Sequence, residues 1–222
     1  MAGHALNKAI RTFARPLLML PMLALLASCN MGGGGKASSQ DATQGDLAGA
    51  RIGAPFTLTN QDGAATSWDD FKGQYRLVYF GYTYCPDICP VDLQRIMQGF
   101  AQFEQARPAL AAKVQPMLIS VDPARDTPAV LKTYVAAFHP RLIGLTGTPD
   151  QIAKVAKDFA VIYGKEESAG ASDYLVSHSR TPYLFGPDGQ PIALVPVDDP
   201  ATADVDEGAP DKVRAFLHQW IK

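Results

Sequence analysis

The sequence predicts an α/β fold in which helices flank a central mixed sheet. Short apolar runs of the kind found in buried strands alternate with segments whose apolar residues recur at helical spacing. A hairpin pattern and one further amphipathic segment close the chain, so the predicted order is βαβαβ followed by ββα. Because strands joined by crossover helices pack into one sheet, this order predicts helices on both faces of that sheet.

Length and charge limit the protein to a few broad classes. The chain has 222 residues, of which 47% are hydrophobic and 19% are charged, and its formal net charge is −2. This length allows one full domain with appendages. A nearly neutral chain lacks the basic balance that nucleic acid requires, so we expect no nucleic-acid partner.

The N-terminal segment has the pattern of a targeting sequence. Basic residues precede an apolar run that is shorter than the roughly 20 residues of a transmembrane helix. The run ends in LASC at 26–29, which resembles the lipobox of bacterial lipoproteins, with Cys29 as the lipidated residue. A plain signal peptide and an uncleaved anchor are the alternatives. We expect a lipoprotein signal peptide at 1–28, a lipid-anchored flexible linker at 29–50 and the folded domain at 51–222.

The first half of the domain contains three predicted strands and one helix. A short strand and turn at 54–63 form an N-terminal strand extension, and an apolar strand follows at 75–80. Apolar residues within 93–100 fall at i, i+3, i+4 and i+7, which defines one face of a helix. The strand at 114–121 has a continuous apolar centre, as a buried strand does.

Two helices with clear start signals come next. Thr127 is a predicted N-cap, with Pro128 in the first helical position. A short strand at 142–145 separates this helix from the next, which begins with a capping box at Thr148.

The last part of the chain is predicted to contain short elements and two loops. These are a polar surface loop at 165–173, a short strand at 174–176, a hairpin at 182–195, a solvated acidic loop at 198–207 and an amphipathic helix over 213–220.

Two cysteines, Cys85 and Cys89, lie where a predicted strand ends and a helix begins. Free N–H groups and the positive end of a helix dipole favour a thiolate over a thiol, so this pair is predicted to be reactive or metal-binding. Pro90 lacks an N–H group and is tolerated in the first helical turn, so regular helix should start near Asp87 or later. Cys85 would then lie on an adjustable loop. A structural disulfide, or two buried small residues, is the alternative.

The cysteine count supports the same interpretation. The chain has three cysteines, and if Cys29 carries lipid, Cys85 and Cys89 remain as a pair. Outside the inner membrane the compartment is oxidising, so free thiols there must be held by a metal, kept reduced by a partner, or cycled.

Four segments resemble the SCO/SenC family and appear in that family's order. They are YFGYTYCPDICP at 79–90, SVDPARDTP at 120–128, FHP at 138–140 and GLTGTP at 144–149. The resemblance runs from about residue 53 to residue 189. It implies a thioredoxin-like fold. A CxxxC motif at the first strand–helix junction of the sheet also resembles that fold.

The resemblance further implies a function and a site. SCO proteins are membrane-tethered and bind copper, and they help to build the binuclear copper centre in subunit II of cytochrome c oxidase. Their ligands correspond to Cys85, Cys89 and His178 of this sequence. Copper(I) is soft and prefers thiolate ligands, with imidazole as a suitable companion.

Other residues are candidates for supporting roles. Asp87 could supply an oxygen ligand to copper(II) or cap the helix, and we favour the cap. Asp122, at a strand end, is a candidate supporting residue or only terminates the strand. Tyr82 and Tyr84 would shield the site from water, or belong to the core. Pro182 resembles the cis-proline that faces the cysteines in thioredoxin-like reductases.

The four histidines differ in their sequence context. His4 lies in the targeting segment, and His218 is expected on the surface of the terminal helix. His139 should end a helix, where the dipole favours an imidazolium. His178 lies in a predicted loop, and its role as a ligand rests on the family resemblance. The family usually has an acidic residue where Ser177 stands here, so Ser177 or a backbone carbonyl is expected to hold the second ring nitrogen of His178.

Two functions follow from these residues. The first is a metallochaperone in the bacterial cell envelope, which delivers copper to cytochrome c oxidase subunit II or another copper protein. The second is a thiol–disulfide oxidoreductase, in which Cys85 attacks and Cys89 resolves. A periplasmic thioredoxin-like reductase is then a further candidate partner. A structural zinc site fits poorly because only three ligands are visible, and a thiol peroxidase fits poorly because Tyr82 stands where that pattern has threonine.

Overall fold

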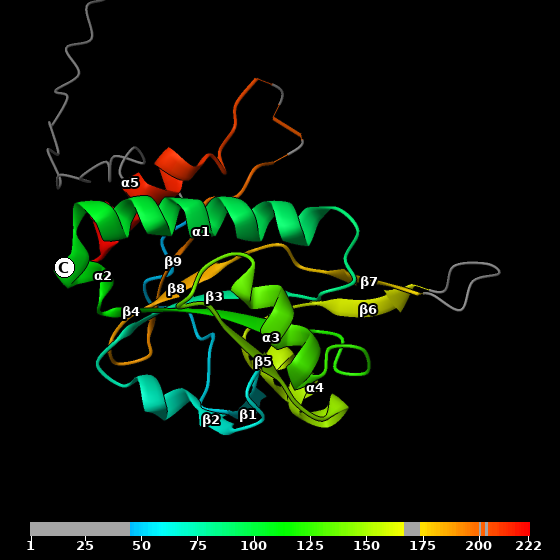
Figure 1. The fold of residues 1–222 in the computed structure, drawn as a ribbon. Coiled ribbons are helices and arrows are strands. Elements are labelled where there is room, and N and C mark those ends of the chain that lie inside the picture. Colours follow the sequence, from blue (N-terminus) through cyan, green and yellow to red (C-terminus); the bar gives the residue numbers. More distant parts are fainter. Residues whose placement is uncertain (1–44, 167–173, 200, 203) are drawn as a thin grey trace, which may run out of the picture. The chain divides into compact units, whose positions relative to one another are not determined.

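The computed structural model describes residues 45–166, 174–199, 201–202 and 204–222 (Figure 1). The predicted signal peptide and Cys29 lie outside these residues, as does most of the predicted linker. Among the described residues, no helix combines the length and the apolar character that crossing a bilayer would need.

A seven-stranded mixed sheet forms the centre of the domain, in the order β2-β1-β5-β4-β3-β8-β9. The neighbours β3, β4 and β5 are parallel, whereas the remaining strands pair antiparallel toward the two edges. The strands are β1 (Thr57–Asn60), β2 (Ala65–Ser67), β3 (Tyr75–Gly81), β4 (Val114–Ser120), β5 (Ile143–Thr146), β8 (Tyr183–Phe185) and β9 (Pro191–Leu194). The predicted mixed sheet is confirmed, with β1 and β2 as its N-terminal extension.

The two central strands end together at the cysteine motif. β3 and β4 align over their full length, from Tyr75 opposite Val114 to Gly81 opposite Ser120. Every residue of β3 is buried, as expected for an apolar strand that is covered on both faces. Because β3 and β4 are parallel, their carboxyl ends open at the same end of the sheet, where the loop with the cysteines begins.

Helices cover both faces of the sheet. α1 (Ile88–Ala106) and α5 (Pro210–Trp220) pack together on one face, while α3 (Pro128–Ala136) and α4 (Pro149–Asp158) lie on the other (Figure 1). A short helix, α2 (Pro108–Ala111), and a 3-10 helix at Trp68–Phe71 complete the helical elements of the described residues.

The predicted start signals of α3 and α4 are confirmed. The Thr127 side chain accepts a hydrogen bond from the Val130 N–H group, and Pro128 occupies the first turn of α3. Thr148 and Gln151 form the predicted capping box of α4. These caps satisfy N–H groups that have no partner within the helix.

A separate two-stranded antiparallel sheet is formed by β6 (Tyr163–Glu166) and β7 (Leu175–His178). The predicted loop at 165–173 was therefore wrong at its start, since residues 165–166 belong to β6. The strand predicted at 174–176 extends further, to His178. β6 contains a glycine and two charged residues, a composition of low strand propensity, so its pattern did not indicate a strand.

Residues just before the predicted domain boundary extend the edge of the main sheet. β8 and β9 form the predicted hairpin, and the segment at 45–47 pairs with the outer side of β9. The pairs are Asp46 with Ala193, Leu47 with Ile192, and Gly45 with Leu194. The predicted linker at 29–50 therefore does not reach residue 50, because its last described residues belong to the folded unit.

Candidate metal centre

Cys85 and Cys89 lie at the junction of β3 and α1, but on different kinds of backbone. Cys85 is half-buried in the loop, whereas Cys89 is buried in the first turn of α1. α1 begins at Ile88, and Pro90 stands in its first turn, as the sequence predicted. Asp87 occupies the N-cap position, but its exposed side chain makes no capping hydrogen bond, so the predicted cap was wrong. A role for Asp87 as an oxygen ligand stays a prediction.

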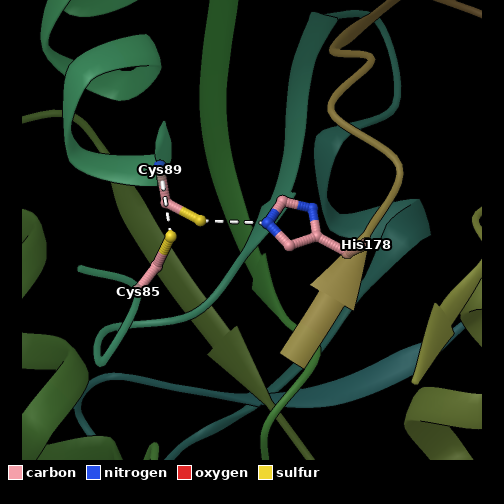
Figure 2. A group of neighbouring side chains, drawn as sticks. All are labelled: Cys85, Cys89 and His178. Carbon is pink, nitrogen blue, oxygen red and sulfur yellow. Dashed lines mark hydrogen bonds between the residues drawn. The ribbon is translucent and has the colours of Figure 1, made fainter. Parts of the chain in front are cut away.

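His178 brings an imidazole to the two cysteines from β7. It is the last residue of that strand, not part of a loop as predicted. Its Nε2 lies 3.0 Å from the Sγ of Cys89, and the Cys89 N–H group donates to the Sγ of Cys85 over 3.4 Å (Figure 2). The donor atoms of the three residues all lie within 4.8 Å of one another. The three residues that the family resemblance singled out therefore form one cluster.

The second ring nitrogen of His178 has a backbone partner. Nδ1 lies 3.0 Å from the carbonyl oxygen of Ser179. Because a carbonyl only accepts, this contact places the proton on Nδ1 and leaves the Nε2 lone pair facing Cys89. The hydroxyl of Ser177 donates instead to the carbonyl of Gly164, 3.2 Å away. Of the two partners considered, a backbone carbonyl holds the imidazole, and it prepares Nε2 to act as a ligand.

The two thiols differ in their protonation. The pKa of Cys85 is lowered well below the usual range of a thiol, first by a hydrogen bond from the Cys89 thiol. The N–H groups of Asp87 and Cys89 act in the same direction, while burial opposes them. The pKa of Cys89 is raised, because its proton is shared with Cys85 and its sulfur is buried. These opposite shifts favour a thiolate on the loop and a thiol on the helix.

Aromatic side chains line the site on one side. The ring of Tyr82 meets the ring of His178 edge-on, with centroids 6.1 Å apart, and the ring of Tyr79 does so at 6.3 Å. Tyr82 is buried, and its hydroxyl accepts the N–H group of Val176 in β7. Tyr84 is 55% exposed, so of the two tyrosines predicted to shield the site only Tyr82 is enclosed.

Asp122 supports this aromatic side of the site and is itself buried. Its carboxylate accepts hydrogen bonds from the hydroxyl of Tyr174 (2.7 Å) and from Nε of Arg125. The Arg125 guanidinium lies 3.8 Å from the ring centroid of Tyr174 and 4.8 Å from that of Tyr84. Asp122 thus orders the tyrosines and the arginine beside the cysteine loop.

Two further buried carboxylates, those of Asp126 and Asp92, connect the elements around the site. The sequence did not indicate that either one would be buried there. Asp126 accepts hydrogen bonds from the backbone and hydroxyl of Thr83 and from the hydroxyl of Ser120, so it fastens the cysteine loop to β4. Asp92, in α1, pairs with Arg180 just beyond β7. The segment SVDPARDTP contains Asp126, but a carboxylate in a loop gives no signal of burial before the fold is known.

Pro182 is buried immediately before β8. Its carbonyl oxygen accepts the Val195 N–H group over 2.9 Å. Its predicted role as a cis-proline facing the cysteines stays a prediction.

A sheet of this topology, with two cysteines at the first strand–helix junction and a histidine facing them, defines a thioredoxin-like protein with a candidate metal centre. The family model described as SCO1/SenC matches residues 44–208. The chain belongs to the SCO1/SenC family.

Curated relatives agree with this assignment. The chain is 47% identical over 134 residues to the mitochondrial SCO2 homolog of Bos taurus, covering 60% of this chain and 50% of that protein. It is 40% identical over 141 residues to a SCO2-like protein of Rickettsia prowazekii, covering 63% and 67% of the two chains. The chain spans about half the length of the mitochondrial relatives that it matches.

Two similar solved structures contain copper. ScoI of Bradyrhizobium japonicum with copper bound has a TM-score of 0.65 and 36% identity, covering 77% of this chain and 99% of that one. Copper-bound ScoI of Arabidopsis thaliana has a TM-score of 0.65 and 36% identity, covering 76% and 96%. The thioredoxin-like fold is confirmed, and the chain has a Cys–Cys–His group that could bind copper. Two sulfurs and one imidazole nitrogen match the donor preference of copper(I).

Proposed function

We propose that this protein is a membrane-tethered copper chaperone that holds copper(I) on Cys85, Cys89 and His178. The observation that carries the proposal is the cluster of their donor atoms within 4.8 Å, with the lone pair of Nε2 facing Cys89. Copper is the cargo of this site. The copper-bound relatives at 36% identity support the choice of metal.

The two cysteines suit a ligand set that must release its cargo. Cys89 is fixed in the first turn of α1, whereas Cys85 lies on the preceding loop. A loop ligand can change position with little disturbance of the packed helix. Cys85 is also the less buried of the two sulfurs, so a receiving protein would reach it first.

The receiving protein that we propose is subunit II of cytochrome c oxidase, at its binuclear copper centre. BsSco, which has 24% identity and a TM-score of 0.51, is described as a member of the Sco family of cytochrome c oxidase assembly proteins. Its likeness to this chain supports the shared fold, and the assembly role is our proposal for this chain. A lipid on Cys29 would tether the domain in the bacterial envelope, outside the inner membrane.

Copper(I) binding by wild type and His178→Ala tests the proposal. The reduced proteins would compete with a chromophoric copper(I) chelator, and His218→Ala, in α5 beside Phe103 of α1, would serve as the matched control. We expect one copper(I) per wild-type chain. The loss of His178 should weaken binding by more than about 100-fold, because removing a ligand exceeds the usual effect of removing a partner of a ligand. Binding that is equally tight in all three proteins would contradict the three-ligand site.

A second candidate is the thiol–disulfide oxidoreductase, favoured by the half-buried Cys85 thiolate beside the buried Cys89 thiol. Cys85 would attack one sulfur of a client disulfide, and the displaced client thiolate would take up a proton. Cys89 would then attack Cys85 and release the second client thiol, so the client gains two electrons and Cys85–Cys89 becomes a disulfide. Reduction of a disulfide peptide that proceeds equally well in His178→Ala, together with weak copper binding, would favour this function.

A further inference from the structure

The metal centre joins two segments that are far apart in the sequence. Cys89 belongs to α1 and His178 ends β7, 89 residues further along the chain. On the far side, His178 pairs with Tyr163 of β6, and the N–H and hydroxyl groups of Ser179 bond to the backbone of Ile162, just before β6. The 3.0 Å approach of Nε2 to Sγ brings this strand end next to α1.

An ion pair with a buried carboxylate makes a further connection between the two segments. Arg180 donates from Nε to Oδ2 of Asp92 over 3.0 Å and from its terminal nitrogen to Oδ1 over 2.7 Å. The Asp92 side chain is 1% exposed, and that of Arg180 is 25% exposed. Two parallel, charge-assisted hydrogen bonds from a planar guanidinium fix both distance and orientation, which a single contact would not do.

The pair lies immediately beside the two ligands. Asp92 follows Cys89 by one helical turn, and Arg180 follows His178 by two residues. The same carboxylate accepts the hydroxyl of Tyr79 over 3.2 Å, and the ring of Tyr79 meets the ring of His178 edge-on. Asp92 therefore connects α1, β3 and the segment that follows β7 at one point.

We propose that the Asp92–Arg180 pair positions His178 against Cys89 and thereby sets how tightly the site holds copper(I). The hydrogen bonds described for Arg180 and Asp92 do not involve the sulfurs or the imidazole nitrogens. Both are therefore positioning residues. The effect on copper rests on the proposed function, whereas the positioning itself can be measured without metal. The competing explanation is that the pair only stabilises the fold.

The matched control comes from the same helix. Arg95, also on α1, pairs with Asp206 over 2.9 Å and lies 3.9 Å from Asp198, so it joins the helix to the acidic loop at 198–207. Arg95→Met removes an ion pair between two segments just as Arg180→Met does. The Arg95 pair is more exposed than the Asp92–Arg180 pair, so the free energy of unfolding of each variant is measured beside its copper affinity. If the Asp92–Arg180 pair acts only through general stability, the loss of affinity should follow the loss of unfolding free energy.

The experiment measures copper(I) affinity of the reduced full chain by chelator competition. The variants are Asp92→Asn, Arg180→Met, the double variant, Arg180→Lys and Arg95→Met. Arg180→Met alone leaves a buried carboxylate without its partner, which can prevent folding. The double variant removes both charges, and Arg180→Lys keeps the charge without the planar fork. Each folded variant is repeated in the His178→Ala background.

We expect the single variants at Asp92 and Arg180 to weaken copper(I) binding about 10- to 100-fold, as the loss of partners that orient metal ligands does. The double variant should weaken it no more than either single variant, and Arg180→Lys should have a partial effect. None of these changes should matter once His178 is alanine. Arg95→Met should keep the wild-type affinity.

A metal-free measurement keeps the two proposals separate. The imidazole resonances of His178, followed by NMR in the reduced metal-free protein, should shift in the Asp92 and Arg180 variants and stay in place in Arg95→Met. If wild-type copper binding does not depend on His178, the proposed function fails, and these resonances alone decide the positioning. Unmoved resonances, or equal losses of affinity with and without His178, would overturn the inference.

Discussion

At the scale of single residues, protonation distinguishes the three donor side chains. A carbonyl oxygen lies against Nδ1 of His178, the pKa of Cys85 is lowered by the neighbouring Cys89 thiol, and the pKa of Cys89 is raised. Because metal ligation requires the thiolate, uptake of copper(I) by both sulfurs would displace a proton from Cys89, whose pKa is raised.

His139 gives a test of buried titration away from the metal centre. Its Nδ1 accepts the N–H group of Arg141, and its Nε2 faces Glu104 at 3.4 Å, next to the ring of Phe100. The imidazolium expected at the helix end was wrong, since burial lowers the pKa of His139, although Glu104 acts in the opposite direction. The neutral ring has a partner at each nitrogen.

The sign of the pH dependence follows from that lowered pKa. The unfolded chain takes up a proton at this residue near pH 6.5, whereas the folded chain does so only at lower pH. Because the unfolded state then binds more protons, the free energy of unfolding falls as the pH drops below about 6.5. We expect His139→Gln to flatten this fall, measured by urea unfolding from pH 7 to pH 5. Equal slopes in the two proteins would contradict the assignment.

The functional role of a residue could be inferred from the sequence only where a local pattern exists. The spacing of Cys85 and Cys89 next to a helix start indicated thiol or metal chemistry directly. His178 is one of four histidines, and only the family resemblance singled it out. Asp92 and Arg180 each have the pattern of an ordinary surface charge, because their pairing depends on a contact across 88 residues of chain.

At the scale of secondary structure, hydrophobic period and capping residues predicted the long elements well. Thr127 and Thr148 marked the starts of α3 and α4, because an N-cap side chain satisfies helix N–H groups locally. The short strands β2 and β6 were missed, since three or four mixed residues carry no clear alternation. Their pairing with a neighbour stabilises them instead.

The contact between α1 and α5 depends on a glycine. A Cβ atom at Gly99 would lie 2.6 Å from the Cβ of Val213 and 2.7 Å from the carbonyl oxygen of Pro210. We expect Gly99→Ala to lower the free energy of unfolding by about 1–3 kcal/mol through overpacking. This would occur although alanine favours a helix by about 1 kcal/mol over glycine.

Gly164→Ala is the control for that substitution, measured by the same urea titration. The nearest heavy atom to a Cβ at Gly164 is the Oγ of Ser177, at 4.0 Å, so the added methyl group meets no obstacle. Its effect on stability should stay within about 0.5 kcal/mol. A Gly99→Ala variant as stable as this control would show that α1 and α5 can separate without loss.

At the scale of the whole domain, the order of strands brings the site together. β3 delivers the cysteines at its carboxyl end, and β8, its antiparallel neighbour, follows directly after the His178 segment. The sequence predicted the α/β class from alternating patterns, but no pattern within one element states which strands are neighbours. The resemblance to a known family supplied that information, and the arrangement of β6 and β7 became clear only from the structure.

The segment at 45–47 has a consequence for how the domain behaves in solution. It occupies the outer side of β9, where the Leu194 N–H and Ile192 carbonyl groups would otherwise be open to another chain. An uncovered strand edge is a template for intermolecular pairing. We expect a fragment that starts at residue 51 to self-associate as its concentration rises, and one that starts at residue 44 to stay monomeric in light scattering. Two equally monomeric fragments would mean that the side chains of β9 themselves protect its edge. The segment at 45–47 would then not be needed to prevent self-association.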